Sequence, residues 1–259
     1  MMRQAFSAVY ITLNAERVLE ESLKSIAFAD EIIVVDSGST DKTLEIAQQY
    51  NAKIIRKEWQ GFGAQKEFAV QKAANNWVLC LDADEVLTPE LAQSIRKFLE
   101  NPSASSAKMA RANVFLGKVL RFGEGYPDWN IRLFQRQQAH WSDDVVHEKV
   151  FVQTRPATLK GDLMHYSSET LFSYLQKQNR YSTLLAKAAI ENGAKPPTLF
   201  KLLASPWVRF VKFYFIRQGF RDGIPGLIHI CIGCFASLLK HAKIWEEFHL
   251  KIKFSTVNA

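Results

Sequence analysis

The sequence predicts an α/β protein built on a mixed sheet and followed by a basic helical extension. Over residues 1–103, short apolar runs alternate with segments of helical spacing, the pattern of a parallel sheet covered by helices. Residues 104–194 begin with aromatic and β-branched runs split by Gly and Pro, which indicates more irregular strands, and end in a long helical pattern. Residues 195–259 form the extension. A chain of 259 residues has room for one large domain, or for one domain with an appendage.

The elements follow one another in a regular order. The expected strands of the first segment cover residues 6–14, 31–39, 52–59 and 77–85. The helices expected after them cover residues 15–29, 40–50, 61–76 and 88–101. Ser39 or Thr40 is a suitable N-cap for the second helix, and Thr88 with Pro89 at the first helical position suits the fourth. Further helices are expected over residues 169–192 and 198–253, the latter broken near Gly223, Pro225 and Gly226.

Composition places the chain among globular proteins. Hydrophobic residues make up 47% and charged residues 23%, so a disordered chain is not expected. The three cysteines, Cys80, Cys231 and Cys234, do not form a disulfide framework, which favours a reducing compartment. The N-terminus lacks a long apolar stretch followed by a small-residue cleavage site, so we expect no signal peptide.

An acidic cluster ends the fourth expected strand. Asp82, Asp84 and Glu85 follow the apolar run 77–81 directly. Crowded carboxylates raise one another's pKa, so such a cluster needs a cation between the acids or full solvation. Polar clusters also end the first two strands, and ligands of parallel sheets bind beyond the carboxyl ends of the strands. We therefore expect the three clusters to converge on one binding site.

Several stretches resemble the family 2 glycosyltransferases. The matching stretches are "VYITLNAERVLEESLKSI", "IIVVDSGSTDKTLEIA" and "WVLCLDADEVLTPEL". Within that family, "YPDWNIRLFQR", "VHEKV" and "GDLMHYS" resemble the bacterial lipopolysaccharide inner-core β-1,4-glucosyltransferase branch. The resemblance implies a GT-A fold and an inverting transfer of a hexose from a nucleotide sugar. The donor it implies is UDP-glucose, and the acceptor is a heptose of the lipopolysaccharide inner core.

By this resemblance, Asp82-Ala83-Asp84 is the D-x-D element that binds the donor through Mg²⁺ or Mn²⁺. The chemistry agrees, because a hard cation held by carboxylates stabilises the charge that develops on a departing diphosphate. We expect Asp84 to bind the metal most directly, with Asp82 nearer the ribose or a metal-bound water. His165 is the candidate that completes the metal shell. The alternatives are a solvated acidic loop and a hydrogen-bonded structural histidine.

The resemblance also implies a set of donor-binding residues. They are Thr12, Asn14, Glu16, Asp36, Lys66, Asp82 and Arg132. Asp36 would bind the uracil or ribose, and Arg132 the diphosphate. Each has a simpler alternative. Asp36 could be an Asx-turn acid that caps the following helix, although Asp41 suits that role better. Lys66 could be a solvated helix residue, and Arg132 could pair with Asp128 at the surface.

An inverting transfer needs a base on the acceptor side. The candidates are Asp128, Asp143, Asp144 and Glu148. Many family 2 enzymes carry an E-D motif in mid-chain, whereas this sequence has "DDVVHE" there. We expect Glu148 to be the catalytic base, with Asp128 as the second choice and His147 as a group that orients Glu148.

The C-terminal extension carries ten Lys or Arg against three Asp or Glu, which equals the whole net charge of +7. Its apolar run, residues 226–239, is shorter than the roughly 20 residues that span a bilayer. Basic helices with aromatic anchors lie in the interface of anionic membranes. We therefore expect a cytoplasmic enzyme bound peripherally to the inner face of the bacterial inner membrane. The alternative is a helical layer packed on the catalytic domain; no nucleic-acid-binding module is recognisable.

Cys231 and Cys234 form a C-x-x-C pattern, but no second ligand pair or redox unit accompanies it, so we expect both to be packed hydrophobes. Two alternatives to the expected activity stay open. One is a glycosyltransferase of the same fold that uses another nucleotide sugar or another lipid-linked acceptor. The other is a non-catalytic membrane protein that binds a nucleotide sugar.

Overall fold

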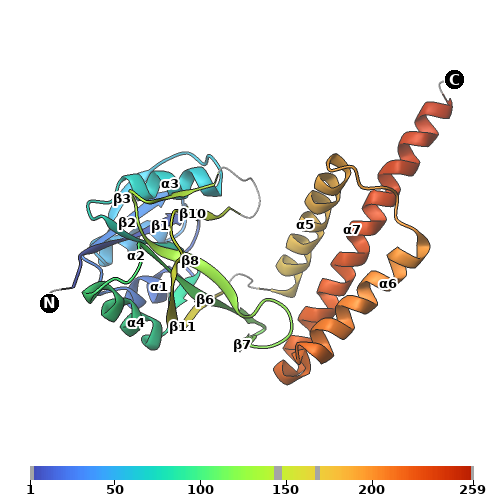
Figure 1. Ribbon diagram of the computed structural model, residues 1–259. Coiled ribbons are helices and arrows are strands. Elements are labelled where there is room, and N and C mark those ends of the chain that lie inside the picture. The colour runs from blue at the N-terminus through green and yellow to red at the C-terminus, as the bar shows by residue number, and fades with distance from the viewer. Residues whose placement is uncertain (1–2, 143–147, 167–169, 258–259) are drawn as a thin grey trace. The chain divides into compact units, whose positions relative to one another are not determined.

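The computed structural model describes residues 3–142, 148–166 and 170–257, and the chain divides into two compact units. The first unit combines residues 1–112 with 127–166, and the second combines 113–126 with 167–259. A sheet with covering helices forms the first unit, and helices dominate the second (Figure 1). The sequence and its resemblance predict a nucleotide-sugar-binding half (1–103), an acceptor and catalytic half of the same domain (104–194) and a basic helical extension (195–259). This division by role stays a prediction.

Four parallel strands form the N-terminal part of the sheet. They are β1 (Phe6–Thr12), β2 (Glu31–Asp36), β3 (Lys53–Arg56) and β4 (Trp77–Asp82). The order is β3-β2-β1-β4, and the register pairs Thr12 with Asp36 and Ile11 with Asp82. The polar clusters that follow β1, β2 and β4 therefore share one edge of the sheet, as predicted.

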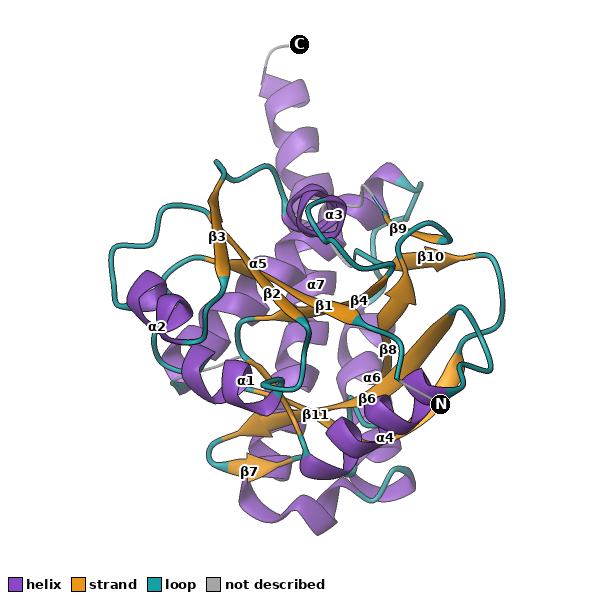
Figure 2. Cartoon of the chain, turned by 90° about the vertical axis from the view of Figure 1, so that its left-hand side faces the viewer, coloured by secondary structure: helices purple, strands orange, loops and turns teal. Residues whose placement is uncertain are grey.

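Helices cover both faces of these strands (Figure 2). They are α1 (Leu19–Ser25), α2 (Thr43–Gln49), α3 (Phe62–Gln71) and α4 (Pro89–Glu100). Alternate residues of β1 enter different cores because successive side chains of a strand point to opposite faces. Ala8 and Tyr10 pack with α1, α2 and α4, whereas Val9 and Ile11 pack with α3. Thr88 caps α4 through its side chain, with Pro89 at the first position, as the sequence predicts.

Antiparallel strands complete the sheet and confirm its mixed character. They are β5 (Glu85–Leu87), β6 (Ser106–Phe115), β8 (Asp128–Gln135) and β11 (Ala157–His165). The order continues from β4 through β8, β6 and β11 to β5, and β8 is antiparallel to both β4 and β6. A separate two-stranded ribbon is formed by β9 (Ala139–Trp141) and β10 (Val150–Val152).

The second unit is built on helices. They are α5 (Leu171–Glu191), α6 (Leu199–Phe210), the π-helical turn η1 (Val211–Ile216), the 3₁₀ turn η2 (Gly219–Asp222) and α7 (Gly223–Val257). Thr170 and Ser173 form a capping box at the start of α5, and Thr198 caps α6. Helix α7 packs against both α5 and α6 (Figure 1).

The tip of a β-hairpin, formed by the end of β6 and by β7 (Lys118–Val119), belongs to this helical unit. Leu120 packs against Ile232 of α7. The buried carboxylate of Asp222 accepts a hydrogen bond of 2.9 Å from the backbone N–H of Phe122. The hairpin tip is therefore fixed to the helices by both an apolar and a polar contact.

Helix α7 is longer than the sequence suggested. The stretch Gly219–Leu250 is long and apolar enough to cross a membrane by length and composition, with a mean hydropathy of 1.6. This corrects the view that the 226–239 run is too short, because the helix continues through the residues on both sides. The core helix of a soluble protein can pass the same test, but only 22% of the apolar window is buried here. The predicted break near Gly223 is confirmed, since α7 begins there with Pro225 in its first turn.

The two cysteines of α7 are only partly packed. Cys231 is exposed and Cys234 is half-buried, so the prediction that both are packed hydrophobes is wrong for Cys231. Cys231 is exposed because it borders an open groove lined by residues of α6 and α7. Cys80 of β4 is buried, and all three thiols are free.

The approach of β11 to α4 supplies a test of the fold. A Cβ at Gly161 would collide with the backbone of Leu91, and the residue has φ +90°. Gly38 has a similar φ of +103° but nothing near the added atom, which makes it a matched control. Gly38→Ala should cost only the backbone strain, roughly 1–2 kcal/mol of unfolding free energy. Gly161→Ala should cost about 1–3 kcal/mol more, because α4 must move. Urea unfolding of both variants measures the difference, and equal losses would contradict this packing.

Candidate functional site

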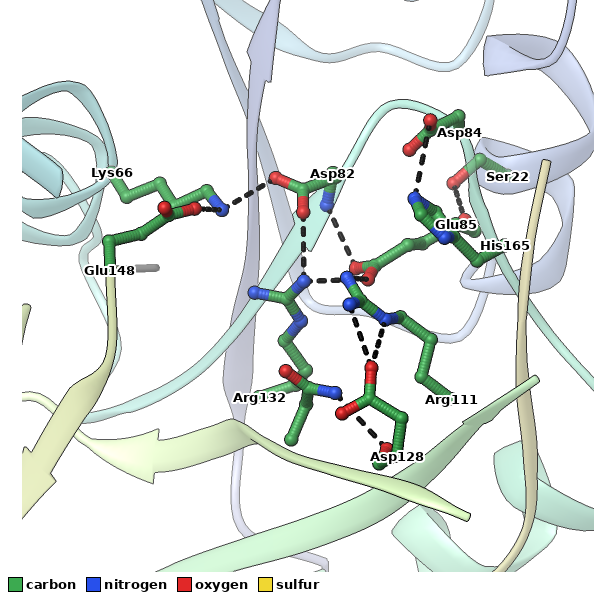
Figure 3. Close-up of polar contacts among 11 residues, drawn as sticks. Ser22, Lys66, Asp82, Asp84, Glu85, Arg111, Asp128, Arg132, Glu148 and His165 are labelled. Atoms are coloured by element: carbon green, nitrogen blue, oxygen red, sulfur yellow. Dashed lines mark hydrogen bonds and ion pairs between the residues drawn. The ribbon is translucent and has the colours of Figure 1, made fainter. Parts of the chain in front are cut away.

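Polar side chains from several strands gather beyond the carboxyl ends of β1, β2 and β4. One cluster joins the loops after β1 and β2. A second cluster surrounds the end of β4 and is drawn in Figure 3. All the site residues predicted from the sequence, apart from those outside the described ranges, belong to one of these two clusters.

Asp36 is the centre of the first cluster. Its carboxylate accepts hydrogen bonds from Thr12 Oγ1 at 2.9 Å, from the Ser39 hydroxyl, and from the backbone N–H groups of Gly38 and Ser39 at 2.9 Å each. Burial alone would raise the pKa of Asp36, but these hydrogen bonds outweigh it and hold the pKa below its usual range. Asp36 thus stays ionised. Its hydrogen bond from the backbone N–H of Gly38, two residues later, also makes Asp36 the first residue of an Asx-turn.

Asn14 and Glu16 connect the two loops. Asn14 has φ 50°, a left-handed conformation that Asn tolerates, and its side-chain oxygen accepts from the backbone N–H of Thr40 at 2.9 Å. Glu16 Oε2 accepts from the backbone N–H of Lys42 at 3.0 Å. Asn14 and Glu16, which are predicted to bind the nucleotide sugar, thus stabilise the conformation of the two loops.

The predicted cap of α2 is wrong. Neither Ser39 nor Thr40 caps the helix, because Asp36 takes the Ser39 hydroxyl. Asp41 instead accepts from the backbone N–H of Thr43 at 3.0 Å, which confirms the turn-forming role expected for it.

Asp82 lies between two buried cations at the end of β4. Its Oδ1 is 2.8 Å from Lys66 Nζ, and its Oδ2 accepts a 2.8 Å hydrogen bond from an Arg132 Nη atom (Figure 3). Burial would raise the pKa of Asp82, but the two cations hold it well below its usual range. The alternative considered for Arg132, a surface pairing with Asp128, does not occur, because Arg132 is 3% exposed and pairs with Asp82 and Glu85.

Lys66 is not a solvated helix residue. It is 1% exposed, and its ammonium donates to Glu148 Oε1 at 2.9 Å as well as contacting Asp82. The Trp141 ring lies 4.8 Å from the ammonium and adds a cation–π contact. Burial would lower the pKa of Lys66, but its acidic neighbours outweigh this and raise the pKa. The candidate base Glu148 is therefore linked by a single lysine to the D-x-D element.

A glycine permits this link. Gly63 lies one turn before Lys66 in α3, and a Cβ there would collide with the backbone oxygen of Ser142. The close approach brings the ribbon of β9 and β10 against α3. The conformation at Gly61, with φ 105°, lets the chain turn into α3.

Glu85 is a site residue for which no separate role is predicted from the sequence. Its side chain is fully buried, and it accepts a 2.6 Å hydrogen bond from Arg132 and a 3.1 Å hydrogen bond from the backbone N–H of Asp82. The only signal in the sequence is its place as the third acid of the cluster. Arg111 is a second such residue, because it lies 3.7 Å from Glu85 and bonds to Asp128 at 2.7 Å.

Asp84 and His165 lie next to each other, with 3.5 Å between Asp84 Oδ2 and His165 Nε2. The antiparallel pairing of β5 with β11 brings them together, since His165 is opposite Glu85. No group of three or more His, Cys, Asp or Glu side chains suited to a metal ion occurs within the described ranges. A carboxylate and an imidazole nevertheless suit a divalent ion that takes its remaining ligands from phosphate oxygens and water.

Some candidates lie outside the described residues. Asp143, Asp144 and His147 fall in the range 143–147, so their predicted roles stay predictions. Glu148 and Asp128 are described, at 19% and 36% side-chain exposure.

Comparisons with known proteins agree on one family. The family model described as "Glycosyl transferase family 2" matches residues 7–154. The lipopolysaccharide core biosynthesis glycosyltransferase LpsC of Rhizobium meliloti is 30% identical over 95% of this chain and 94% of its own length. An uncharacterized glycosyltransferase of Rickettsia bellii is 33% identical over 95% of this chain and 88% of its own. Among solved structures, the mannosyltransferase PcManGT of Pyrobaculum calidifontis, in complex with GDP-Man and Mn²⁺, has a TM-score of 0.53 at 17% identity, covering 95% of this chain and 88% of its own.

The buried ammonium of Lys66 makes a prediction about stability and pH. Lys66→Met leaves Asp82 and Glu148 without their shared cation, so at pH 7 we expect a loss of about 3–5 kcal/mol of unfolding free energy. The folded pKa of Asp82 lies below its unfolded value of about 4, so the ion pair stabilises the fold above that pH and this contribution fades as the pH falls through the folded pKa. The difference between wild type and variant should therefore shrink below pH 4.

Urea unfolding from pH 7 to pH 2.5 measures this difference. Lys72→Met is the matched control, because Lys72 ends the same helix and is exposed, and it should change stability little at any pH. A Lys66→Met loss that stays constant down to pH 2.5 would show that packing rather than charge determines the effect.

Proposed function

This chain belongs to glycosyltransferase family 2, and we propose that it transfers glucose from UDP-glucose, with inversion, onto a heptose of the lipopolysaccharide inner core. The glycosyltransferase activity follows from the family, and the sheet has the GT-A fold. The observation that carries the finer proposal is the arrangement at the end of β4, where acids and cations suited to a metal-bound diphosphate lie together. The relative named for lipopolysaccharide core biosynthesis supports the acceptor class.

The donor is proposed to bind along the carboxyl edge of the parallel strands. Asp36, ionised and held by the loop, accepts hydrogen bonds from the uracil or ribose, and Thr12 orients it. Lys66 and Arg132 attract the diphosphate, because their positive charges lie beside Asp82 at the carboxyl end of β4. Asn14 and Glu16 act mainly by shaping the loop that lines the nucleotide pocket.

A divalent ion, Mg²⁺ or Mn²⁺, is proposed to bind between Asp84 and His165, with Asp82 contributing through water or the ribose. When bound, the ion supplies positive charge to the departing diphosphate. The known mannosyltransferase of similar fold was solved with Mn²⁺, which supports a divalent ion in this class of site. In the absence of donor, Lys66 and Arg132 neutralise Asp82, so the acidic cluster is stable before the ion arrives.

The chemical step is a single displacement. An acceptor hydroxyl oxygen forms a bond to the anomeric carbon while the bond from that carbon to the phosphate oxygen breaks. The hydroxyl proton passes to Glu148, and UDP leaves with the bonding electrons. The ammonium of Lys66 lies 2.9 Å from Glu148 Oε1 and holds the Glu148 carboxylate in position for this role. Asp128 is the second candidate, but Arg111 holds it away at the edge of the cluster.

The enzyme is proposed to work at the cytoplasmic face of the inner membrane, where its acceptor is anchored. The basic charge of residues 195–259 and the exposed apolar side chains of the helical unit support peripheral attachment. Helix α7 packs against α5, on which Arg180, Lys187 and Glu191 are exposed. This charged neighbour favours attachment at the surface over a lipid-surrounded span.

Removal of Asp84 tests the metal site. Asp84→Ala should abolish metal-dependent transfer and also the thermal stabilisation by UDP-glucose with Mn²⁺. A donor at 100 times its Kd should raise the stability of the wild type by about 2.7 kcal/mol. Glu20→Ala, at an exposed acid of α1, is the control and should behave as wild type. If a GDP- or ADP-sugar stabilised the protein and UDP-glucose did not, the assignment of UDP-glucose as the donor would be wrong. Full activity of Asp84→Ala would show that Asp84 is not needed to bind the metal.

Two isosteric variants identify the base. Glu148→Gln should lower kcat by roughly 10²–10⁴ while leaving the stabilisation by donor intact, because the donor site does not need the base. Asp128→Asn should lower kcat far less. Steady-state kinetics with a purified lipopolysaccharide acceptor, alongside thermal shifts, separates these outcomes. A larger loss of kcat in Asp128→Asn than in Glu148→Gln would show that Asp128 is the base.

A further inference from the structure

Helix α6 of the second unit has an apolar face without a partner among the described residues. Phe200, Leu203 and Trp207 are 81%, 55% and 70% exposed, and Val211 at the start of η1 continues the row. Their spacing of three or four residues places them on one side of the helix. Large hydrophobic side chains gathered in this way mark a surface that binds something apolar.

The rotation of α6 that exposes this face is fixed by a partly buried ion pair. Arg209 lies on the opposite side of α6 from Trp207, since two residues of helix correspond to a turn of about 200°. Its guanidinium pairs with Glu124 of the hairpin tip. Gly233 of α7 makes room for the pair, because a Cβ there would lie 2.7 Å from a Glu124 oxygen and 3.1 Å from Arg209 Nε. The basic residue in the last turn of α6 is thus turned inward, and the apolar face is turned outward.

A groove opens beside the apolar face. It has a volume of about 270 Å³ and lies between α6 and α7. The lining residues are Pro206, Trp207, Phe210, Cys231 and Cys234. Trp207 belongs to both the face and the groove, so the two surfaces are continuous. A groove with almost no polar lining has nothing to bind a sugar or a phosphate, but it suits a narrow hydrocarbon chain.

The charged side chains exposed on α6 and on residues 211–221 have one sign. Lys201, Lys212, Arg217 and Arg221 are exposed on or near α6. No Asp or Glu occurs between residues 195 and 221. Apolar and aromatic side chains bordered by bases complement a bilayer that contains anionic lipids, in which headgroups are negative and acyl chains lie just beneath. A soluble protein partner would not require that combination.

We propose that the groove between α6 and α7 binds one acyl chain of an anionic phospholipid, while the apolar face of α6 lies in the interfacial layer of the bilayer. This rests on the peripheral attachment proposed above and adds a specific lipid site to it. The chain enters beside Trp207 and contacts Phe210 on one wall and the two cysteines of α7 on the other. The bases bind the headgroups, and the lipid holds α6 and α7 together at the membrane surface.

Photo-crosslinking tests the site with the full chain. The protein is bound to vesicles of phosphatidylglycerol and phosphatidylcholine that contain a phospholipid with a diazirine at the end of one acyl chain, and adducts are located by mass spectrometry. We expect adducts on both walls, in segments 206–210 and 231–234. Adducts confined to the outward residues of α6, with none in 231–234, would show that the groove does not bind the acyl chain, although the protein attaches to the membrane. Failure to bind the vesicles, or self-association through this face without lipid, would overturn the attachment as well.

A groove-filling variant provides the second measurement. Cys231→Phe should reduce adducts in segment 206–210 about tenfold while vesicle binding persists. The reason is that the phenyl ring fills part of the groove, so that roughly two fewer methylene groups of the acyl chain are buried. Ile224→Phe is the control, because Ile224 is 73% exposed on α7 and does not line the groove. Unchanged adducts in Cys231→Phe would overturn the groove as the site. Sugar transfer to a water-soluble acceptor should be normal in both variants, so loss of the lipid site and failure of the proposed activity are distinguishable.

Discussion

Two buried cations, Lys66 and Arg132, hold together three carboxylates that would otherwise repel one another. Lys66 contacts Asp82 and Glu148, and Arg132 contacts Asp82 and Glu85. Ions taken out of water are tolerated only when they are paired and hydrogen-bonded, so no member of the set can be removed without leaving a charge uncompensated. These contacts connect α3, β4, β5 and β8 with Glu148, which lies just before β10 in the chain.

The same charges explain how a stable fold can also be a reactive site. An apolar core at this edge would be easier to stabilise, but it could not hold a diphosphate. Asp82, neutralised on both sides, keeps the cluster stable in the absence of donor. In the proposed reaction, a negatively charged donor and a divalent ion would replace contacts that the protein makes with itself. Gly63 supports this arrangement, because only a residue without a side chain lets Ser142 come close enough for Glu148 to meet Lys66.

Much of the first unit could be predicted from the sequence, because apolar runs and parallel topology determine where strand ends lie. The convergence of Thr12, Asp36 and Asp82 follows from these alone. The pairing of Lys66 with Glu148 does not, since 82 residues separate them and the contact depends on the approach of a ribbon to α3. The roles of Glu85 and Arg111 depend on the register of antiparallel strands, which β6 shifts by a bulge at residues 107 and 108. Sequence spacing carries no signal for such pairings.

A crystal structure with UDP-glucose and Mn²⁺ tests whether the tip of β4 binds a metal-bound nucleotide diphosphate. The anomalous signal of manganese should lie between Asp84 and His165, with the phosphates bridging the ion and the side chains of Lys66 and Arg132. An ion and phosphates bound away from β4, with the Lys66–Asp82–Arg132 contacts unchanged, would contradict the account.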